Sequence, residues 1–436
     1  MASEHPFQVL FESFGRLPAS HADAVNRPSL LALCEVLSVP LAHAGRGILL
    51  RAPRAGHGKT HLLTQAWQSM ETGHAFIPLH AVAGTRIDAL SVMDDTLRHL
   101  ERRLPGRGAL CGLEALARRL FALALQPLVR SGDVPCLDRD AALDALRQRP
   151  LQTLDFHHPQ AVTAQWMQGN FEALGPRLSW ELAQLTGLPA RATGFWVTVL
   201  FRFATSAIDH PGRFDALVQT TLGAGPGDGA AIERLATLLA LMTVLSRVVL
   251  VADELDGCCA ETSAGVRLAS FLASLGQHAE RLDVIVAVNH DVWERVFAPH
   301  LSSGLAERLS EVVIELAPLT DAEMLELLES RAPGMGSRVM AHIEPGHGVR
   351  RARSLLQAAA AAWPQVAPPS TPPASDQSDQ SDQSDQSDQS DQSDQSPAPP
   401  ATPESPGASD DAGAFDAGRV DALLRQFRER YGRPGT

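Results

Sequence analysis

The chain has 436 residues, of which 44% are apolar, and this length and composition are typical of a globular protein with two or three cooperative units. The net charge is −13 and no block of basic residues is interleaved with aromatic residues, so nonspecific binding to duplex nucleic acid is not indicated. Five scattered cysteines without a CxxC pair exclude a disulfide framework and a zinc site, and predict a reducing compartment.

The sequence also argues against secretion and against a membrane. The N-terminal segment MASEHPFQVLFES lacks the basic and apolar regions of a secretory signal. Two apolar runs, residues 194–208 and 235–252, are each interrupted by an arginine and fall short of the ~20 apolar residues that span a bilayer. We expect these runs to form buried helix and buried strand in a cytoplasmic protein that does not contact a membrane.

Five short apolar runs are predicted to be strands, and they alternate with long helical patterns. Continuous apolar runs are typical of strands buried on both faces, and their alternation with helices predicts a parallel sheet covered by helices. The predicted strands are GILLRA (47–52), AFIPLHA (75–81), RVVLVA (247–252), LDVIVAV (282–288) and EVVIEL (311–316). The long stretch between the second and the third strand is predicted to be helical.

The first predicted strand is followed by GHGKT and then by a predicted helix, KTHLLTQAWQSM. Phosphate binding needs a flexible turn that points backbone N–H groups inward, followed by a helix N-terminus that faces the anion. Gly56 and Gly58 would supply the turn, Lys59 would bridge the β- and γ-phosphates, and Thr60 would place its hydroxyl on Mg²⁺. The neighbouring His57 and His61 complete the predicted nucleotide-binding set.

One position departs from the full phosphate-loop pattern G-x-x-x-x-G-K-[ST], because Pro53 stands where the first glycine is expected. Proline fixes φ and removes an N–H, so the start of the loop must differ. Lys59, however, is the only lysine in the chain. A compact ammonium on a flexible stem reaches between two phosphates, which a planar guanidinium does not replace, so the composition itself indicates that Lys59 is functional.

Acidic and amide side chains end the next two core strands. The strand 247–252 ends in Asp253 and Glu254. A carboxylate at this tip can hold Mg²⁺ through water, and the adjacent Glu254 can polarise the water that attacks the terminal phosphate. Asn289 ends the following strand and could orient that water or contact the γ-phosphate, although asparagine is also a common turn residue.

The C-terminal part of the chain changes in composition twice. The segment LTDAEMLELLESRA is predicted to be a helix with a capping box formed by Thr320 and Glu323, and a second helix is predicted to end near Trp363. Residues 364–417, which include a perfect Ser-Asp-Gln repeat, are predicted to be a disordered linker. The tail, residues 418–436, has apolar residues at helical spacing and would either fold back onto the chain or bind a partner.

Taken together, these motifs resemble the ASCE division of P-loop NTPases, and the run LAERLSEVVIELAPLTDAEMLELLESRAP is similar to AAA+ proteins. The phrases DELD and PLT-x-x-E are most similar to origin-recognition-type initiators and to STAND-like ATPases. The resemblance implies an α/β fold: a three-layer P-loop core with a five-stranded parallel sheet, a large helical insertion and a small helical lid. The expected units are residues 1–99 and 246–318 for the core, 100–245 for the insertion, 319–363 for the lid, 364–417 for the linker and 418–436 for the tail helix.

The resemblance also implies roles for single residues. Asn289 corresponds to sensor 1, and Arg308 corresponds to an arginine finger that acts on the nucleotide of a neighbouring subunit, unless it only pairs with Glu307 or Glu311. Arg351 best matches sensor 2, with Arg350 as the alternative. The segment Asn26-Arg27 loosely resembles the part of these proteins that borders the adenine.

The length of the predicted insertion departs from compact AAA+ proteins. Either an all-helical insertion domain separates the two Walker motifs, or the closer relatives are KAP-like NTPases, which carry inserts at the same place. Inserts of the latter kind typically span a membrane, and the arginines within the apolar runs of this chain argue against that.

The resemblance implies that the chain binds and hydrolyses ATP with Mg²⁺ and couples the nucleotide state to remodelling or regulation of a macromolecular partner. A slow-turnover nucleotide-gated switch is the alternative that Pro53 favours, and a DNA-acting initiator or loader is the other. The expected partners are ATP, a protein bound through the insertion or the tail helix, and further copies of the chain in a homo-oligomer. Such initiators usually append a winged-helix domain, and the roughly 20 residues after the linker are too few for one, because independent folding needs ~40 residues or more.

Overall fold

The computed structural model describes residues 5–8, 14–17, 21–71, 73–81, 86–223, 228–257, 259–344 and 346–366. The predicted tail helix and nearly all of the predicted linker lie outside these residues. None of the described helices is long and apolar enough to cross a membrane.

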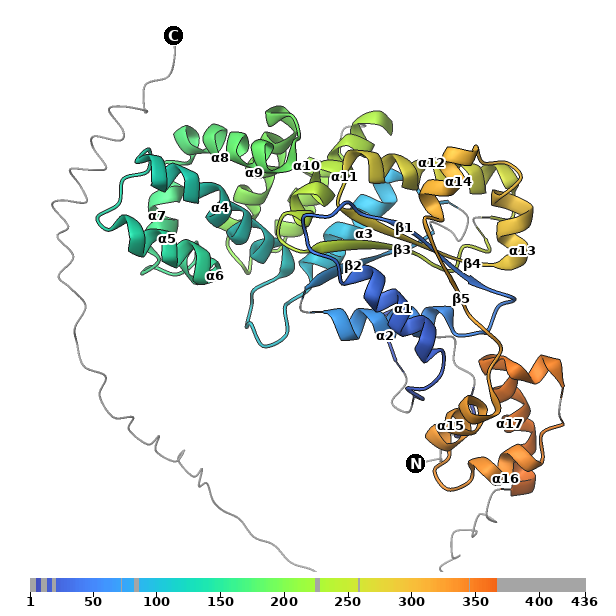
Figure 1. The fold of residues 1–436 in the computed structure, drawn as a ribbon. Helices are drawn as coiled ribbons and strands as arrows, with labels where there is room; N and C mark the ends of the chain where they lie inside the picture. The colour runs from blue at the N-terminus through green and yellow to red at the C-terminus, as the bar shows by residue number, and fades with distance from the viewer. Residues whose placement is uncertain are drawn as a thin grey trace, which may run out of the picture.

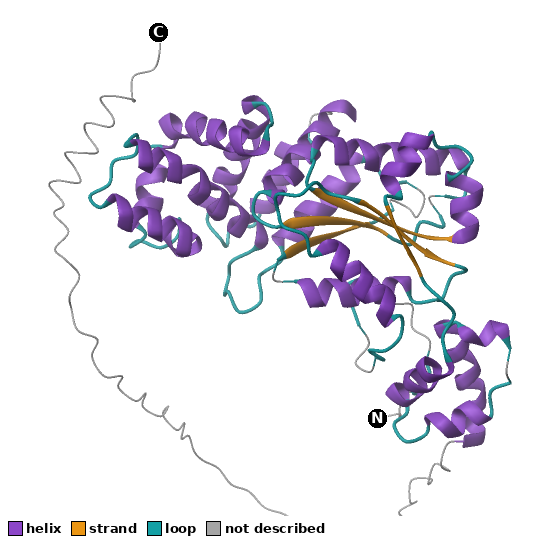
Figure 2. Cartoon of the chain, in the orientation of Figure 1, coloured by secondary structure: helices purple, strands orange, loops and turns teal. Residues whose placement is uncertain are grey.

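A five-stranded, all-parallel sheet forms the centre of the molecule, as the sequence predicts (Figures 1 and 2). The strand order is β2-β3-β4-β1-β5, so that β4 lies between β1 and β3. The strands are β1 (Gly47–Ala52), β2 (His74–Leu79), β3 (Arg247–Ala252), β4 (Leu282–Asn289) and β5 (Val312–Glu315). Two of the five, β1 and β3, have the predicted bounds, and the bounds of the other three differ from the prediction by at most two residues at either end.

Helices cover both faces of the sheet, and each face has its own apolar core. One face packs against α1 (Arg27–Leu37) and α2 (Lys59–Met70). The other face packs mainly against α3 (Ala89–Glu101), α11 (Asp228–Thr243), α12 (Thr262–His278) and α14 (Ser303–Leu309). The strands are buried on both faces for this reason, which accounts for their continuous apolar sequences.

A large helical region lies between β2 and β3, which confirms the predicted helical character of this part of the chain. It continues the apolar core of the sheet through α3 and α11, and Trp196 is fully buried within this core. The Trp196 Nε1–H donates to the Arg234 carbonyl at 2.9 Å and so joins α9 (Ala190–Thr205) to α11. The helices beyond the sheet are α4 (Gly112–Ser131), α5 (Arg139–Gln148), α6 (Pro150–Thr153), α7 (Val162–Gly169), α8 (Phe171–Thr186), α9 (Ala190–Thr205) and α10 (Arg213–Leu222).

The remaining helices follow the last two strands. A short helix α13 (His290–Val292) and a π-helical turn η1 (Trp293–Phe297) follow β4. After β5, a separate apolar cluster holds α15 (Asp321–Arg331), α16 (Gly336–Ala341), the 3₁₀ turn η2 (His347–Arg350) and α17 (Ala352–Val366). These C-terminal helices lie at the end of the molecule away from α4–α9 (Figure 1).

The predicted capping box of α15 is present, with Thr320 and Glu323 bonded to each other's backbone N–H groups. The last helix continues to Val366, three residues beyond its predicted end and into the first residues assigned to the linker.

A buried ion pair ties β3 to β4 at the start of both strands. Arg247 and Asp283 are only 2% and 1% exposed, and two guanidinium N–H groups donate to the carboxylate at 2.8 Å. The same carboxylate accepts the Arg46 N–H, and Arg247 donates to the Pro40 carbonyl. Full satisfaction of both charges by this network makes their burial tolerable.

We therefore expect Asp283→Ala to lower the free energy of unfolding by about 3–5 kcal/mol, because it leaves the buried Arg247 guanidinium uncompensated. Urea denaturation followed by circular dichroism measures the loss. Asp144→Ala, which removes the carboxylate of an exposed pair with Arg147, is the control and should change stability by less than about 0.5 kcal/mol. Equal losses in the two variants would contradict the role assigned to the pair.

Candidate functional site

The glycine loop, residues 53–58, connects β1 to α2 at the carboxyl edge of the sheet. Gly56 and Gly58 have φ values of 88° and 94°, a left-handed conformation that only glycine adopts without strain. Gly58 is also the N-cap of α2, which begins at Lys59. The predicted arrangement of strand, glycine turn and helix N-terminus is therefore present, with Pro53 directly after the strand.

Two buried side chains, those of His57 and Asn26, stabilise the glycine loop through hydrogen bonds to its backbone carbonyls. His57 is 4% exposed, and its Nδ1 lies 2.9 Å from the Arg54 carbonyl. Because a carbonyl oxygen only accepts, Nδ1 carries the proton, and burial lowers the pKa of the ring. Asn26 donates from its amide to the His57 carbonyl at 2.9 Å. The His57 side chain thus supports the loop and does not line the cavity in front of it.

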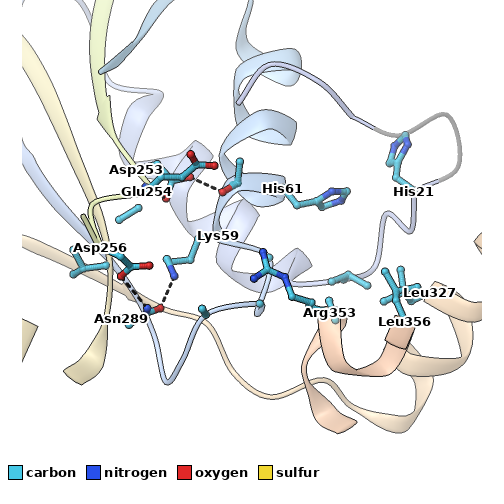
Figure 3. Close-up of a pocket in the computed structure, with 18 of the residues that line it drawn as sticks. His21, Lys59, His61, Asp253, Glu254, Asp256, Asn289, Leu327, Arg353 and Leu356 are labelled. Atoms are coloured by element: carbon cyan, nitrogen blue, oxygen red, sulfur yellow. Dashed lines mark hydrogen bonds between the residues drawn. The ribbon is translucent and has the colours of Figure 1, made fainter. Parts of the chain in front are cut away.

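The ends of β1, β3 and β4 bring four predicted side chains together in two contacts (Figure 3). The Lys59 ammonium donates to the Asn289 side-chain oxygen at 2.6 Å. The Thr60 hydroxyl donates to the Asp253 carboxylate, also at 2.6 Å. The members of each pair are about 200 residues apart in the chain, and the parallel sheet places them side by side.

The turn after β3 presents two further carboxylates. Glu254 is exposed and has a φ of 56°, an unusual value for a residue with a side chain, and its N–H donates to the Asp253 carboxylate at 2.9 Å. Asp256 accepts a long hydrogen bond from the Asn289 amide, at 3.5 Å. Sequence reasoning did not single out Asp256, although its position three residues after Asp253 in the same turn was available as a signal.

Burial shifts the pKa values of the basic and acidic groups of the site in opposite directions. It lowers the pKa of the Lys59 ammonium, while the carboxylates of Asp253 and Asp256 act against this shift. It raises the pKa of Asp253, while the hydrogen bond from Thr60 acts against it. Glu254 is exposed but partly shielded from water by the neighbouring chain, and this partial desolvation, together with the charge of Asp253, raises its pKa. A desolvated ammonium gains from an anion, and a desolvated carboxylate gains from a cation, so the site suits a ligand that brings both.

A cavity of about 550 Å³ lies in front of the glycine loop, within the range of small-molecule sites. Its walls come from the loop, the strand ends, an N-terminal segment and the C-terminal helices. Eight of the predicted site residues line it: Gly56, Gly58, Lys59, Thr60, His61, Asp253, Glu254 and Asn289. His21 also lines it, with its ring centroid 6.1 Å from that of His61.

Neither arginine predicted as sensor 2 lines the cavity. Arg350 donates to the Leu319 carbonyl and to Asp321, so it fastens η2 to the start of α15. Arg351 donates to the Gly348 carbonyl at 3.3 Å. Arg353, two residues further along, lines the cavity instead. The spacing of three residues between Arg353 and Leu356 places both on one face of a helix, and Leu356 also lines the cavity. This spacing was a sequence signal that could have pointed to Arg353.

Arg308 lies away from the cavity on the exposed side of α14. It forms no ion pair with Glu307 or Glu311, both of which the structure describes. The surface pair considered as the alternative for this residue is therefore not formed in the structure, and its proposed action on a second subunit stays a prediction.

Hydrogen bonds tie the glycine loop to the C-terminal helices. The Arg353 N–H donates to the Gly56 carbonyl at 3.1 Å, and a Cβ at Gly56 would meet the Arg353 side chain at 2.9 Å. Asn26, which donates its amide to the loop, also donates its N–H to the Glu323 carboxylate at 3.1 Å. Asn26, which the sequence suggests could border the adenine, links the loop to α15 in the structure.

Comparisons with protein-family models, with curated proteins and with solved structures find no match to this chain. The arrangement of the sheet is that of an α/β fold, consistent with a Rossmann-like or a P-loop architecture.

The role of Asn26 can be separated into two parts. Asn26 is 6% exposed and has a φ of 58°, which asparagine and glycine tolerate better than alanine. Asn26→Gly should lower the free energy of unfolding by about 1–3 kcal/mol, because the buried His57 carbonyl loses its donor. Asn26→Ala should cost about 1–2 kcal/mol more through backbone strain. Thermal and urea denaturation measure the free energy of unfolding of both variants. Equal stability of Asn26→Gly and Asn26→Ala would contradict the backbone strain assigned to this position.

Proposed function

We propose that the chain is a P-loop ATPase of the ASCE division, similar to AAA+ proteins, that binds ATP with Mg²⁺ in the cavity at the carboxyl edge of the sheet and hydrolyses it. The observation that carries the proposal is the convergence of Lys59 and Thr60, at the start of α2, with Asp253 and Asn289, at the ends of β3 and β4. Hydrolysis would be coupled to remodelling or regulation of a macromolecular partner.

The residues present fit a magnesium triphosphate. The glycine loop and the N-terminus of α2 face the cavity where phosphates would lie, and the Lys59 ammonium is half-buried beside them. The Thr60 hydroxyl and the Asp253 carboxylate, which touch each other, are two oxygen ligands of the kind that Mg²⁺ takes, directly or through water. Bound Mg²⁺ would neutralise charge on the phosphate oxygens.

The remaining strand-end residues have positions suited to the attacking water. Glu254 projects from the turn after β3 at the exposed side of the cavity, where its carboxylate can accept a proton from water. Asn289 contacts Lys59 and Asp256, so its amide lies between the ammonium and the acidic turn. From there it can orient the water or the terminal phosphate.

Arginines of the C-terminal helices and of α14 complete the proposal. Arg353 lines the cavity on the side of the C-terminal helices, which would act as the lid, and it takes the sensor 2 position expected of Arg351. Arg308 is exposed on α14 and would act on the nucleotide of a neighbouring copy in a homo-oligomer. A guanidinium in either place would neutralise charge on the phosphoryl group that is transferred.

A nucleotide-gated switch with slow turnover is a second candidate, favoured by Pro53. Proline at the start of the glycine loop has a fixed φ and no N–H, so the entry to the loop differs from the full phosphate-loop pattern, although Pro53 itself does not line the cavity. The switch would bind ATP through the same residues and differ only in its rate of hydrolysis.

Lys59→Arg keeps the positive charge and tests the shape requirement for the only lysine of the chain. We expect the affinity for ATP with Mg²⁺ to fall about 10- to 100-fold, because the guanidinium cannot reach between two phosphates in the same cradle. Calorimetric titration measures the affinity, and Arg54→Lys at the exposed part of the loop is the matched control. Unchanged affinity in Lys59→Arg would contradict the assignment of the phosphate site.

Glu254→Gln tests whether the chain is an enzyme. We expect the rate of phosphate release to fall about 10²- to 10⁴-fold, because the amide cannot accept a proton from water, while ATP affinity stays within about threefold. Glu261→Gln, an exposed acid of the same loop that does not line the cavity, should behave as the unaltered protein. A chain with slow turnover that Glu254→Gln leaves unchanged would instead support the switch.

A further inference from the structure

The proposed nucleotide cavity extends beyond the phosphate-binding residues to a second, apolar end. Figure 3 shows Leu327 and Leu356 on the far side of Arg353 from Lys59. Ala22 and Val25 of the N-terminal segment line the cavity together with these leucines. Side chains of this kind suit the faces of a flat ring better than they suit a phosphate or a sugar.

Arg331 is a cationic residue that lines the cavity close to this apolar end. It is the last residue of α15 and follows Leu327 by one helical turn, so both side chains lie on the same face of the helix. Arg353 also lines the cavity, but it lies close enough to the Lys59 ammonium to lower the pKa of that group. Arg353 therefore belongs to the phosphate end, and Arg331 belongs to the end next to Leu327.

The Arg331 guanidinium has no hydrogen-bond acceptor or ion-pair partner among the residues that the structure describes, and its Nε atom is buried. Arg51 and Arg118 also have a buried Nε without an acceptor, but their terminal guanidinium nitrogens are bonded, Arg51 to Glu315 and Arg118 to Asp155 and the Leu151 carbonyl. Arg331 differs because none of its guanidinium nitrogens has a partner among the described residues. A buried donor without an acceptor is costly, so the cavity near Arg331 favours a ligand that supplies acceptors.

A purine base meets both requirements of this end of the cavity. Its faces are flat and can pack between Ala22, Val25 and the two leucines, and its ring nitrogens accept hydrogen bonds along the edge. The residues named at this end include no carboxylate that would pair with Arg331 and remove its donors. A phosphate is the competing acceptor, but Lys59 and the glycine loop place it at the opposite end.

We propose that Arg331 reads the base of the bound nucleotide by donating a hydrogen bond from its guanidinium to a ring nitrogen of the purine. This inference rests on the proposed function, because it takes the triphosphate to lie on the glycine loop. Arg331 is then a specificity-determining residue that does not take part in hydrolysis itself. Arg331 therefore contributes to the binding free energy of a nucleotide but not to that of a ligand without a base.

The test is a cycle that combines Arg331→Met with loss of one ring nitrogen from the ligand. Calorimetry of the full chain with Mg²⁺ measures the affinities for ATP, for its 1-deaza, 3-deaza and 7-deaza analogues and for inorganic tripolyphosphate. We expect the unaltered protein to bind one of the three analogues about 5- to 100-fold more weakly than ATP. Arg331→Met should bind ATP more weakly by a similar factor, no longer distinguish that analogue, and bind tripolyphosphate as before.

Two further variants keep the test interpretable. Arg338→Met removes an exposed arginine of α16 that does not line the cavity and should leave all the affinities unchanged. Arg331→Leu also removes all the guanidinium donors and should show the same loss of discrimination, so it replaces Arg331→Met if the methionine variant does not fold.

The inference is overturned if the Arg331 variants keep the full discrimination among the analogues, if they bind ATP unchanged, or if they lose tripolyphosphate affinity as much as ATP affinity. Failure of the proposed function gives a different result, namely an unaltered protein that binds neither ATP nor tripolyphosphate more tightly than Lys59→Ala does.

Discussion

The parallel pairing of β4 with both β1 and β3 is the constraint on which the rest of the site depends. Residues Ala52 and Asn289 are partners in register, and β3 pairs with β4 on its other side, so three strand ends meet at one edge. Asp253 and Glu254 directly follow the last residue of β3, and Asn289 is the last residue of β4, because the middle parts of these strands are apolar and buried on both faces. The Arg247–Asp283 pair secures the register of β3 and β4 at the opposite edge.

The contacts between the glycine loop and the C-terminal helices give the site a route to conformational change. The loop is bonded to α17 through the Gly56 carbonyl and to α15 through Asn26 and Glu323. A ligand that altered the loop would change its fit to both helices at once. Coupling of this kind requires that the ligand bind the two conformations of the loop with different free energies. The hydrogen bonds between the loop and the two helices can supply this difference if they form in only one of the conformations.

Much of the fold could be predicted from local patterns. Continuous apolar runs identified all five strands, and the capping box placed the start of α15, because both signals depend on residues adjacent in the chain. The cavity-lining residues of the glycine loop and the strand ends also follow from position in sequence. The arginines of the C-terminal helices do not: Arg350, Arg351 and Arg353 differ by one or two positions, and only the rotation of η2 and α17 decides which of them faces the cavity.

The sequence by itself determined the parallel α/β class, the glycine loop and the position of the only lysine, Lys59, directly after that loop, since these depend on residue type and on neighbours in the chain. Only the tertiary structure decided the contacts of Lys59 with Asn289 and of Thr60 with Asp253, the supporting position of His57 and Asn26, and the presence of Arg331 and Arg353 at the cavity. The physical reason is that strand order and helix orientation are set by packing between segments about 200 residues or more apart, which no local pattern encodes.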